Sequence, residues 1–349
     1  MTTPAEALPG TGRDELRYTA FGLELRIDPR IAVPGLVEDD GSSAISNPGQ
    51  SEAIAKPREG EDHTPPVQPP SHVRLDGGEE VRRRWGALTV APVRTREVRF
   101  GETLIRSVDF AEPAGYLLWA REYGRVLISS DGLELLCEPD PANEDWASIV
   151  SSQALPLAAT LRGFEVVHAS GVVLDGQAVL ITGPAGAGKT SLAAALVRIG
   201  GALLSDDAVA LEPSADTLVA HAGSLALQLR AAEDERLSPR ERTALGEPTG
   251  SIEGKRRYTS RRTPSPAPFG CLFLLERSMR EPVIEELVAV DPFELLASTF
   301  NLSVHTPERL RRQLDVVAAI ASHGQVYRLR VQPDVDATEL AAVVHEHLA

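Results

Sequence analysis

The chain has few cysteines and few lysines. The first shortage excludes sites built from cysteine, and the second makes each lysine informative. It contains 2 cysteines in 349 residues, Cys137 and Cys271, too few for a disulfide framework or a cysteine-based metal site. Both lie in apolar runs, which favours buried small hydrophobic residues. Of the 35 lysine and arginine residues, the only lysines are Lys56, Lys189 and Lys255. Because arginine is the usual cation here, each lysine suggests a position that needs a point charge.

The chain also lacks an excess of positive charge, a leader and a long apolar run. Its net charge is −15 and its pI is near 5.1, which argues against a general nucleic-acid or membrane-surface binder. No charged-then-apolar leader opens it, and no run of about eighteen apolar residues is present. We therefore expect a cytoplasmic protein with no nucleic-acid or membrane partner. Hydrophobic residues make up 42% of the chain, enough for a sizeable core.

Composition along the chain predicts a small β-rich domain followed by a larger one. Alternation around Leu23 and Leu25 indicates a strand or hairpin, and Ser130-Asp131-Gly132 indicates a second hairpin turn. Between them, a Pro-, Ser- and Gly-rich stretch cannot bury enough apolar surface to offset chain entropy. A helix is expected over Asp145–Leu161. The predicted parts are a β-rich N-terminal segment (1–36), a disordered insertion or linker (37–80), the remainder of the small β-rich domain (81–145) and the catalytic domain (146–349).

The stretch from Phe164 to Leu192 carries the chemistry. VVHASGVVL predicts one strand, Asp175-Gly176 a turn, and QAVLI a second strand. The loop GPAGAGKT follows, and SLAAALVRIG predicts a helix of strong helix formers. This is the strand–loop–helix context in which the Walker A pattern G-x-x-x-x-G-K-[ST] indicates a phosphate-binding loop, or P-loop.

Each loop residue has a physical reason to be there. Gly183, Gly186 and Gly188 let the backbone wrap closely and point N–H groups at phosphate oxygens. The helix that starts near Lys189 adds its positive dipole end. Lys189 supplies a compact charge to the β- and γ-phosphates, and Thr190 a hydroxyl to Mg²⁺. The expected cofactors are therefore ATP and Mg²⁺.

Two carboxylates and a histidine are candidate partners of this loop. Asp206 and Asp207 follow a short predicted strand, ALL, and ligands of open α/β sheets gather at the carboxyl ends of strands. One carboxylate can hold Mg²⁺ and the other can accept a proton; a solvated acidic turn or a helix cap is the alternative. His168 is either a structural histidine or a member of the site, since pairing across the Asp175-Gly176 turn places it near the start of the loop.

A basic stretch, GKRRYTSRR, lies at Gly254–Arg262, before a predicted apolar strand, FGCLFLL. It is either a solvated basic loop or, because it contains one of the few lysines, a mobile loop that closes over the phosphates. We expect Lys255 and Arg256 to neutralise charge in the transition state. The predicted nucleotide-binding residues are Gly183, Pro184, Ala185, Gly186, Ala187, Gly188, Lys189, Thr190, Ser191, Lys255 and Arg256.

HASGVV, LITGPAGAGKTSLA and LLSDDAVAL together resemble the catalytic domain of HPr kinase/phosphorylase and its shorter relatives. The resemblance is clear over about 160–215 and weaker onward to a predicted strand, YRLR, near 327–330. It implies an α/β fold, an HPr-kinase-type P-loop catalytic domain with a small β-rich N-terminal domain. It also implies that Asp206 is the base toward a serine hydroxyl, that Asp207 binds Mg²⁺ together with Thr190, and that His168 tunes Asp206; the catalytic set is then Asp206, His168 and Lys189.

The chain departs from the family after the acidic pair. No counterpart of the family's glycine-containing substrate signature or of its C-terminal helix motif is visible. GSLALQLRAAED lacks the proline and tryptophan that the short relatives often carry. Some of those relatives are associated with peptide natural-product clusters, which makes a precursor peptide one candidate acceptor. The family's assembly into hexamers leaves a homo-oligomer open.

These observations predict an ATP-dependent serine kinase, an enzyme that transfers the γ-phosphoryl group to a hydroxyl, most readily a serine of a peptide or protein. Two alternatives stay open. One is a nucleotide-dependent binding or regulatory protein that transfers nothing, in which the acidic pair would hold Mg²⁺ only. The other is a small-molecule kinase, because the sequence does not distinguish a metabolite hydroxyl from a peptide serine.

Overall fold

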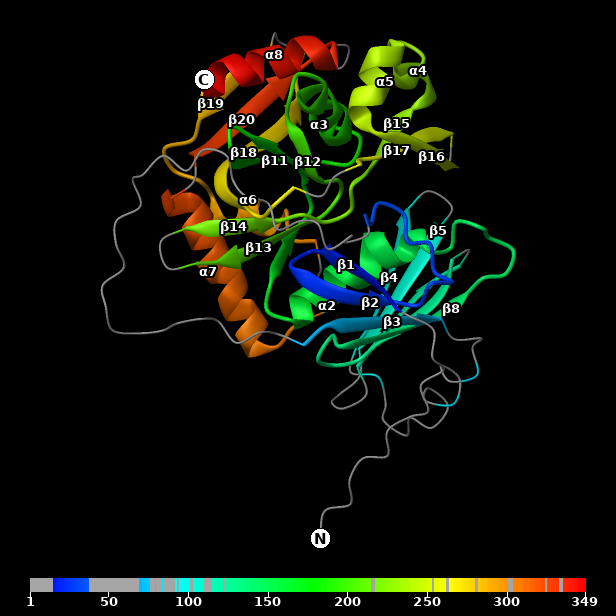
Figure 1. The fold of residues 1–349 in the computed structure, drawn as a ribbon. Helices are drawn as coiled ribbons and strands as arrows, with labels where there is room; N and C mark the ends of the chain where they lie inside the picture. The colour runs from blue at the N-terminus through cyan, green and yellow to red at the C-terminus, as the bar shows by residue number, and fades with distance from the viewer. Residues whose placement is uncertain are drawn as a thin grey trace, which may run out of the picture.

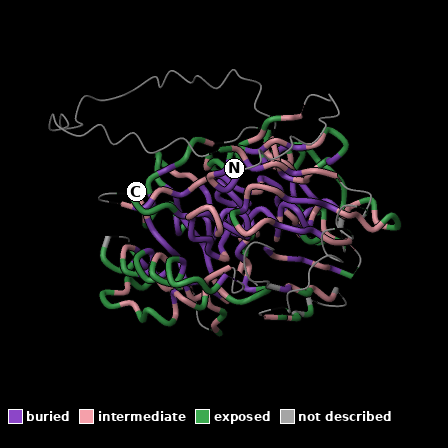
Figure 2. Tube along the Cα trace, turned by 90° about the horizontal axis from the view of Figure 1, so that it is seen from below, coloured by how far each residue is buried: buried purple, intermediate pink, exposed green. Residues whose placement is uncertain are grey.

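The chain folds as a mixed α/β structure, the class that its sequence predicts. The structure is a computed structural model that describes residues 15–37, 69–75, 94–100, 103–109, 115–121, 123–214, 217–252, 254–261, 264–279, 282–300, 304–323, 325–332 and 335–349, with the single residues 79, 83 and 92. Among these residues the strands form three sheets (Figure 1). Figure 2 shows that the buried residues are concentrated in the strands of the interior.

The first sheet is built from the N-terminal part of the chain. Its β1–β2 hairpin turns at Phe21 and Gly22, both at positive φ, and confirms the hairpin predicted there. Ser130-Asp131-Gly132 joins two antiparallel strands, as predicted. In spatial order the strands are β1 (Leu16–Ala20), β2 (Leu23–Ile27), β3 (Ser71–Leu75), β8 (Glu134–Pro139), β7 (Gly124–Ile128), β6 (Tyr116–Ala120), β5 (Thr103–Asp109) and β4 (Arg94–Phe100).

Strand β3 corrects the extent of the predicted insertion. We expected disorder over residues 37–80, but Ser71–Leu75 pair in parallel with β2 and with β8. The run SHVRL has only two apolar residues, and the prolines before it obscure its strand signal. Ser71 and Val73 are nevertheless buried, because β3 lies between β2 and β8. Residues 38–68, 76–78 and 80 of the predicted insertion lie outside the described residues.

The second sheet carries the glycine-rich loop. Strand β18 lies at its centre and pairs in parallel with β11 and with β20. The sequence predicts the positions of β11, β12, β18 and β20, and the structure confirms them. The strands are β12 (Ala202–Ser205), β10 (Ser170–Leu174), β11 (Gln177–Thr182), β18 (Ala267–Arg277), β14 (Leu218–His221), β13 (Val209–Pro213) and β9 (Glu165–Val167), with β20 (Gln325–Val331) and β19 (Val283–Glu286) beside β18.

The stretch expected to form one strand before the turn is in fact two. β9 pairs with β13, whereas β10 pairs with β11 and β12. The chain leaves the strand at His168 because the His168 N–H donates to the Ser298 carbonyl at 2.6 Å instead of to a neighbouring strand. This break gives His168 its own orientation at the edge of the sheet.

Helices cover both faces of the second sheet. α3 (Lys189–Arg198) and α8 (Ala337–Leu348) share one hydrophobic cluster with β11, β18 and β20, and α7 (Pro307–His323) closes another cluster on the opposite face. α6 (Pro292–Leu296) precedes α7. Within the described residues, no helix is both long enough and apolar enough to cross a membrane.

The helix predicted over Asp145–Leu161 is shorter and less regular than expected. One π-helical turn spans Val150–Ala154, and α2 spans Leu155–Leu161. Pro156 has no N–H, so the α-helical hydrogen-bond ladder cannot continue through it from the preceding turn. α2 packs between the first sheet and the second, in a cluster that includes Ile27, Leu155 and Val166.

The third sheet contains the basic stretch, which corrects a second expectation. β15 (Ala226–Arg230), β17 (Lys255–Thr259) and β16 (Glu247–Ile252) form three antiparallel strands, with α4 (Ala231–Asp234) and α5 (Pro239–Leu245) beside them. Lys255 and its neighbours were expected in a loop, but they form the central strand. Every second side chain of a strand faces the same side, so Tyr258 can be buried in a stretch that looks uniformly polar.

A buried ion pair joins α7 to β9. Arg309 Nη2 donates to Glu165 Oε1 at 2.7 Å, and the two side chains are 3% and 2% exposed. Burial raises the pKa of Glu165, and the nearby Arg309 charge opposes that rise. The pair fixes α7 against the strand that leads directly into His168.

Removing one partner should therefore cost more than removing both. Arg309→Met leaves Glu165 buried without this guanidinium, and we expect a loss of about 3–5 kcal/mol in the free energy of unfolding. The double variant Arg309→Met with Glu165→Leu should recover most of that loss. Urea unfolding of the three proteins checks this, and a double variant no more stable than Arg309→Met would contradict it.

Candidate functional site

The glycine-rich loop connects the end of β11 to the start of α3. Gly183 has φ 150° and Gly188 has φ 107°, conformations that side chains with a Cβ rarely adopt. A Cβ on Gly183 would lie 2.4 Å from the Leu275 carbonyl oxygen of β18. Gly183 is thus required both by its φ and by the close approach of the neighbouring strand.

Lys189 folds back over this loop. Its Nζ donates to the Gly183 carbonyl at 2.9 Å and to the Pro184 carbonyl at 3.4 Å. Burial lowers the pKa of Lys189, and the charges of Asp207 and Asp206 oppose that shift. The ammonium is held by neutral carbonyls rather than by a salt bridge, so an anion in the loop can attract it without breaking an ion pair.

Asp206 lies at the end of β12 and is 7% exposed. Its Oδ1 accepts hydrogen bonds from Ser170 Oγ at 2.6 Å and from Thr190 Oγ1 at 3.1 Å. Burial, together with the charge of Asp207, raises the pKa of Asp206 to about 6, against the pull of these hydroxyls. The loop, β10 and β12 therefore meet at one carboxylate whose pKa lies near neutral pH.

Asp207 and His168 form the solvent-exposed side of the same site. We call the part of the sheet edge where the loop, Asp206, Asp207 and His168 meet the corner. Asp207 has φ 72°, and its side chain is 59% exposed. His168 Nδ1 lies 2.9 Å from the Asp207 carbonyl oxygen and 3.6 Å from its carboxylate. Because a carbonyl oxygen only accepts hydrogen bonds, Nδ1 carries the proton. Thr182 Oγ1 donates to the His168 carbonyl at 2.9 Å, which fixes the histidine at the start of the loop.

The structure thus brings together the loop, both aspartates and His168. Lys255 and Arg256 lie on β17, where Lys255 pairs with Arg230 of β15. Arg256 Nε lies 3.7 Å from an Asp234 oxygen. Among the described contacts only Lys255 is linked to the loop, through its strand neighbour Arg230, whose Nη2 lies 3.9 Å from the position of a Cβ on Gly186; none places Arg256 at the loop.

Sequence reasoning missed four residues at this corner. Ser170 donates to Asp206, and Glu233 accepts a hydrogen bond from Ser191 at 2.9 Å. Arg230 and Arg277 reach the loop from the ends of β15 and β18. Only Arg277 carried a usable signal, since it follows closely on a predicted strand, FGCLFLL, at the end where ligands collect. These four are Ser170, Arg230, Glu233 and Arg277.

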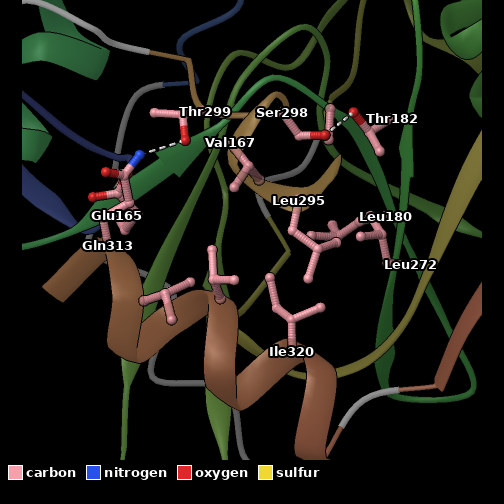
Figure 3. Close-up of a pocket in the computed structure, with 13 residues that line it drawn as sticks. Glu165, Val167, Leu180, Thr182, Leu272, Leu295, Ser298, Thr299, Gln313 and Ile320 are labelled. Atoms are coloured by element: carbon pink, nitrogen blue, oxygen red, sulfur yellow. Dashed lines mark hydrogen bonds between the residues drawn. The ribbon is translucent and has the colours of Figure 1, made fainter. Parts of the chain in front are cut away.

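A small cavity lies behind the loop, between α7 and the sheet (Figure 3). Its free volume is about 10 Å³, close to the space of one water. Thr182 Oγ1, whose own proton goes to the His168 carbonyl, accepts from Ser298 Oγ at 3.0 Å on one side, and Gln313 Nε2 donates to Thr299 Oγ1 at 2.7 Å on the other. It has no room for a nucleotide, so a ligand of the loop would bind on the outer side.

The donor set fits a magnesium ion bound together with phosphate. Among the described residues, no group of three or more His, Cys, Asp or Glu side chains is arranged to hold a metal alone. Mg²⁺ is usually held by one or two protein oxygens, substrate phosphates and waters. Thr190 donates its proton to Asp206, which leaves its oxygen lone pairs for a cation, and Asp207 offers an exposed carboxylate.

Comparison with known proteins gives weak similarity to solved structures. No protein-family model matches the chain, and no curated protein matches it. Among solved structures it is similar to the Hpr(Ser) kinase/phosphatase from Coxiella burnetii, with a TM-score of 0.29 and 15% sequence identity, over 53% of this chain and 96% of that one. Because a similarity at this level is weak, we base the function on the residues of this chain.

The raised pKa of Asp206 predicts a stability difference that depends on pH. The ionised form is less favourable in the folded state than in the unfolded state, so its penalty grows as pH rises from 3.8 to about 6. At pH 7 without Mg²⁺, Asp206→Asn should therefore be more stable than the wild type, by on the order of 3 kcal/mol. Below about pH 4 the difference should vanish.

Urea unfolding at pH 4 and pH 7 in a chelating buffer measures this difference. Asp175→Asn is the matched control, because Asp175 lies in an exposed turn at φ 48°, a conformation that asparagine tolerates. A stability gain of Asp206→Asn that is equal at both pH values would contradict the assignment.

Proposed function

We propose that this protein is an ATP-dependent kinase that transfers the γ-phosphoryl group to a hydroxyl, a serine of a peptide or protein. The observation that carries the proposal is the hydrogen bond from Thr190 to the buried Asp206. It joins the residue that would meet the metal to the carboxylate that would meet the hydroxyl. An ordinary glycine-rich turn has no need for such a carboxylate.

The phosphates would be bound by the loop Gly183–Thr190 and by Ser191. Its glycines let the backbone approach a ligand closely, and α3 begins at Lys189, so the helix dipole favours an anion there. Lys189 would exchange its two carbonyl acceptors for phosphate oxygens. Thr190 and Asp207 would hold Mg²⁺, which when bound neutralises phosphate charge during transfer.

Asp206 would accept the proton of the attacking hydroxyl. A general base works best with a pKa near the operating pH, and the pKa of Asp206 is about 6. Ser170 holds this carboxylate in place by its 2.6 Å hydrogen bond. His168, with its proton on Nδ1, would orient the Asp206-Asp207 turn through the Asp207 carbonyl.

One contact also supports the reverse assignment of the two carboxylates. The Thr190–Asp206 hydrogen bond would keep Asp206 beside the metal. Asp207, exposed and 3.6 Å from His168 Nδ1, would then face the acceptor. The two assignments differ in which asparagine variant weakens Mg²⁺ dependence and which one abolishes transfer at saturating Mg²⁺.

The exposure of this corner suits a large acceptor. Asp207 is 59% exposed and His168 is 37% exposed, so a hydroxyl on a peptide or protein segment can reach them. The choice of serine follows the resemblance of HASGVV, the loop and LLSDDAVAL to HPr-kinase-like sequences. Lys255 and Arg256 would add positive charge beside the phosphates from β17.

The first test follows the label of γ-labelled ATP with Mg²⁺, with the protein alone and with proteins or peptides encoded by neighbouring genes. We expect label on a serine-containing acceptor. Asp206→Asn should bind ATP within about threefold of the wild type but lose transfer by roughly 10²-fold or more, because it removes the proton acceptor. Asp175→Asn should retain full transfer.

Three outcomes would contradict parts of this proposal. Tight ATP binding with no label on any acceptor would favour the nucleotide-dependent binding protein. Full transfer by Asp206→Asn together with none by Asp207→Asn would reverse the two carboxylate roles. Label on a small metabolite alone would replace the peptide acceptor by a small molecule.

A second test concerns Lys255. Lys255→Ala should lower turnover by roughly tenfold, because it removes one charge near the phosphates, in the range of a single charge-assisted hydrogen bond. Arg261→Ala is the control, since Arg261 lies just beyond the same strand, is 61% exposed and pairs with Glu247. Steady-state kinetics of both variants measure the effect. Equal turnover rates for Lys255→Ala and Arg261→Ala would contradict a role of Lys255 at the site.

A further inference from the structure

Two arginines approach the glycine-rich loop from strands of different sheets. Arg277 is the last residue of β18 and Arg230 the last residue of β15. Arg277 Nη2 lies 2.9 Å from the position that a Cβ on Gly188 would occupy, and Arg230 Nη2 lies 3.9 Å from the corresponding position on Gly186. The absence of a side chain at Gly188 gives the Arg277 guanidinium room, whereas Arg230 lies at ordinary contact distance from the Cβ position of Gly186.

Arg277 is anchored in this position. Its Nη1 donates to the Gln332 carbonyl at 2.7 Å, just beyond the end of β20. This bond uses one nitrogen of the planar guanidinium and leaves Nη2 directed at the loop. A guanidinium held at one end is pre-organised for a phosphate at the other, so little side-chain entropy is lost on binding.

Neither arginine has a carboxylate partner among the described residues, although the chain is acidic. Other arginines of the same region do have partners. Arg328 contacts Glu294 and Glu276, and Arg330 contacts Glu285. With 50 acidic residues against 35 basic ones, two exposed guanidinium groups beside a glycine-rich loop are the exception rather than the rule.

The two guanidinium groups are also close enough to repel each other. The pKa of Arg277 is lowered by burial and by the charge of Arg230. Like charges held close together are unfavourable, and an anion between them converts that repulsion into attraction. The loop beside them supplies backbone N–H groups that favour the same anion.

We infer that Arg230 and Arg277 form a pair of phosphate-binding residues that close on the phosphate chain of a nucleoside triphosphate held by the loop. The inference rests on the proposed function and extends it to two residues outside the Gly183–Ser191 segment. Each guanidinium donates to phosphate oxygens, one from the third sheet and one from the second. The two guanidinium groups would also lie beside the negative charge that develops on the phosphoryl group during transfer.

The test measures binding of MgATP and of inorganic triphosphate with Mg²⁺ by calorimetry. Arg230→Gln and Arg277→Gln should each weaken both ligands by roughly tenfold or more, the range of a hydrogen bond to a charged group. Arg277→Lys should bind more tightly than Arg277→Gln, since it keeps the charge but loses the planar fork. Arg330→Gln is the matched control, an arginine of neighbouring β20 that should leave affinity unchanged.

The variant Lys189→Ala distinguishes a failure of this inference from a failure of the proposed function. If the wild type binds MgATP and Lys189→Ala abolishes binding, while both arginine variants bind like Arg330→Gln, the inference is overturned and the proposed function stands. If the wild type binds neither ligand, the proposed function itself fails. Thermal unfolding of each variant shows whether the Gln332 contact matters for folding. If Arg277→Gln does not fold, the affinity of Arg230→Gln, a variant at an exposed residue, tests the inference alone.

Discussion

The parallel pairing of β11 with β18 is the constraint on which the site depends. The pairing register aligns Thr182, the last residue of β11, with Leu274. The residue after it then lies so close to the Leu275 carbonyl that a Cβ there would clash. Gly183 meets this requirement and turns the chain toward α3. Because β11 and β18 run in the same direction, the loop and Arg277 arrive at one edge of the sheet. The antiparallel β10 lies between β11 and β12, so the acidic pair at the end of β12 reaches the same edge.

The corner built at this edge holds unfavourable features that an isolated chain would avoid. Asp206 is buried beside a second carboxylate, Asp207 adopts a left-handed conformation, and Lys189 contacts neutral carbonyls instead of an acid. Strain and perturbed ionisation of this kind persist only where the surrounding fold determines them. The buried core around β18 and the Arg309–Glu165 pair supply that support, since both hold the strands that enter the corner.

Strong local patterns could be read from the sequence, and weak or long-range ones could not. The hairpins, β11, β12, β18 and β20 follow from short apolar runs bounded by glycines and turn residues. β3 did not, because five residues among prolines become a strand only when β2 and β8 flank them. The break at His168 depends on Ser298, which lies far along the chain. The π-turn before Pro156 and the strand made by Lys255–Thr259 likewise reflect packing rather than local preference.

The sequence by itself determined the α/β class and where the candidate chemistry lies. A glycine-rich loop followed by Lys189 and Thr190, and the acidic pair Asp206-Asp207 after a strand, are local patterns whose residues must be adjacent in the chain. The tertiary structure alone decided which groups surround them. Ser170 beside Asp206, the His168 ring beside the Asp207 carbonyl, and Arg230 and Arg277 beside the loop are contacts between separate strands. Such contacts depend on sheet order and pairing register, which the hydrophobic pattern of one strand does not specify.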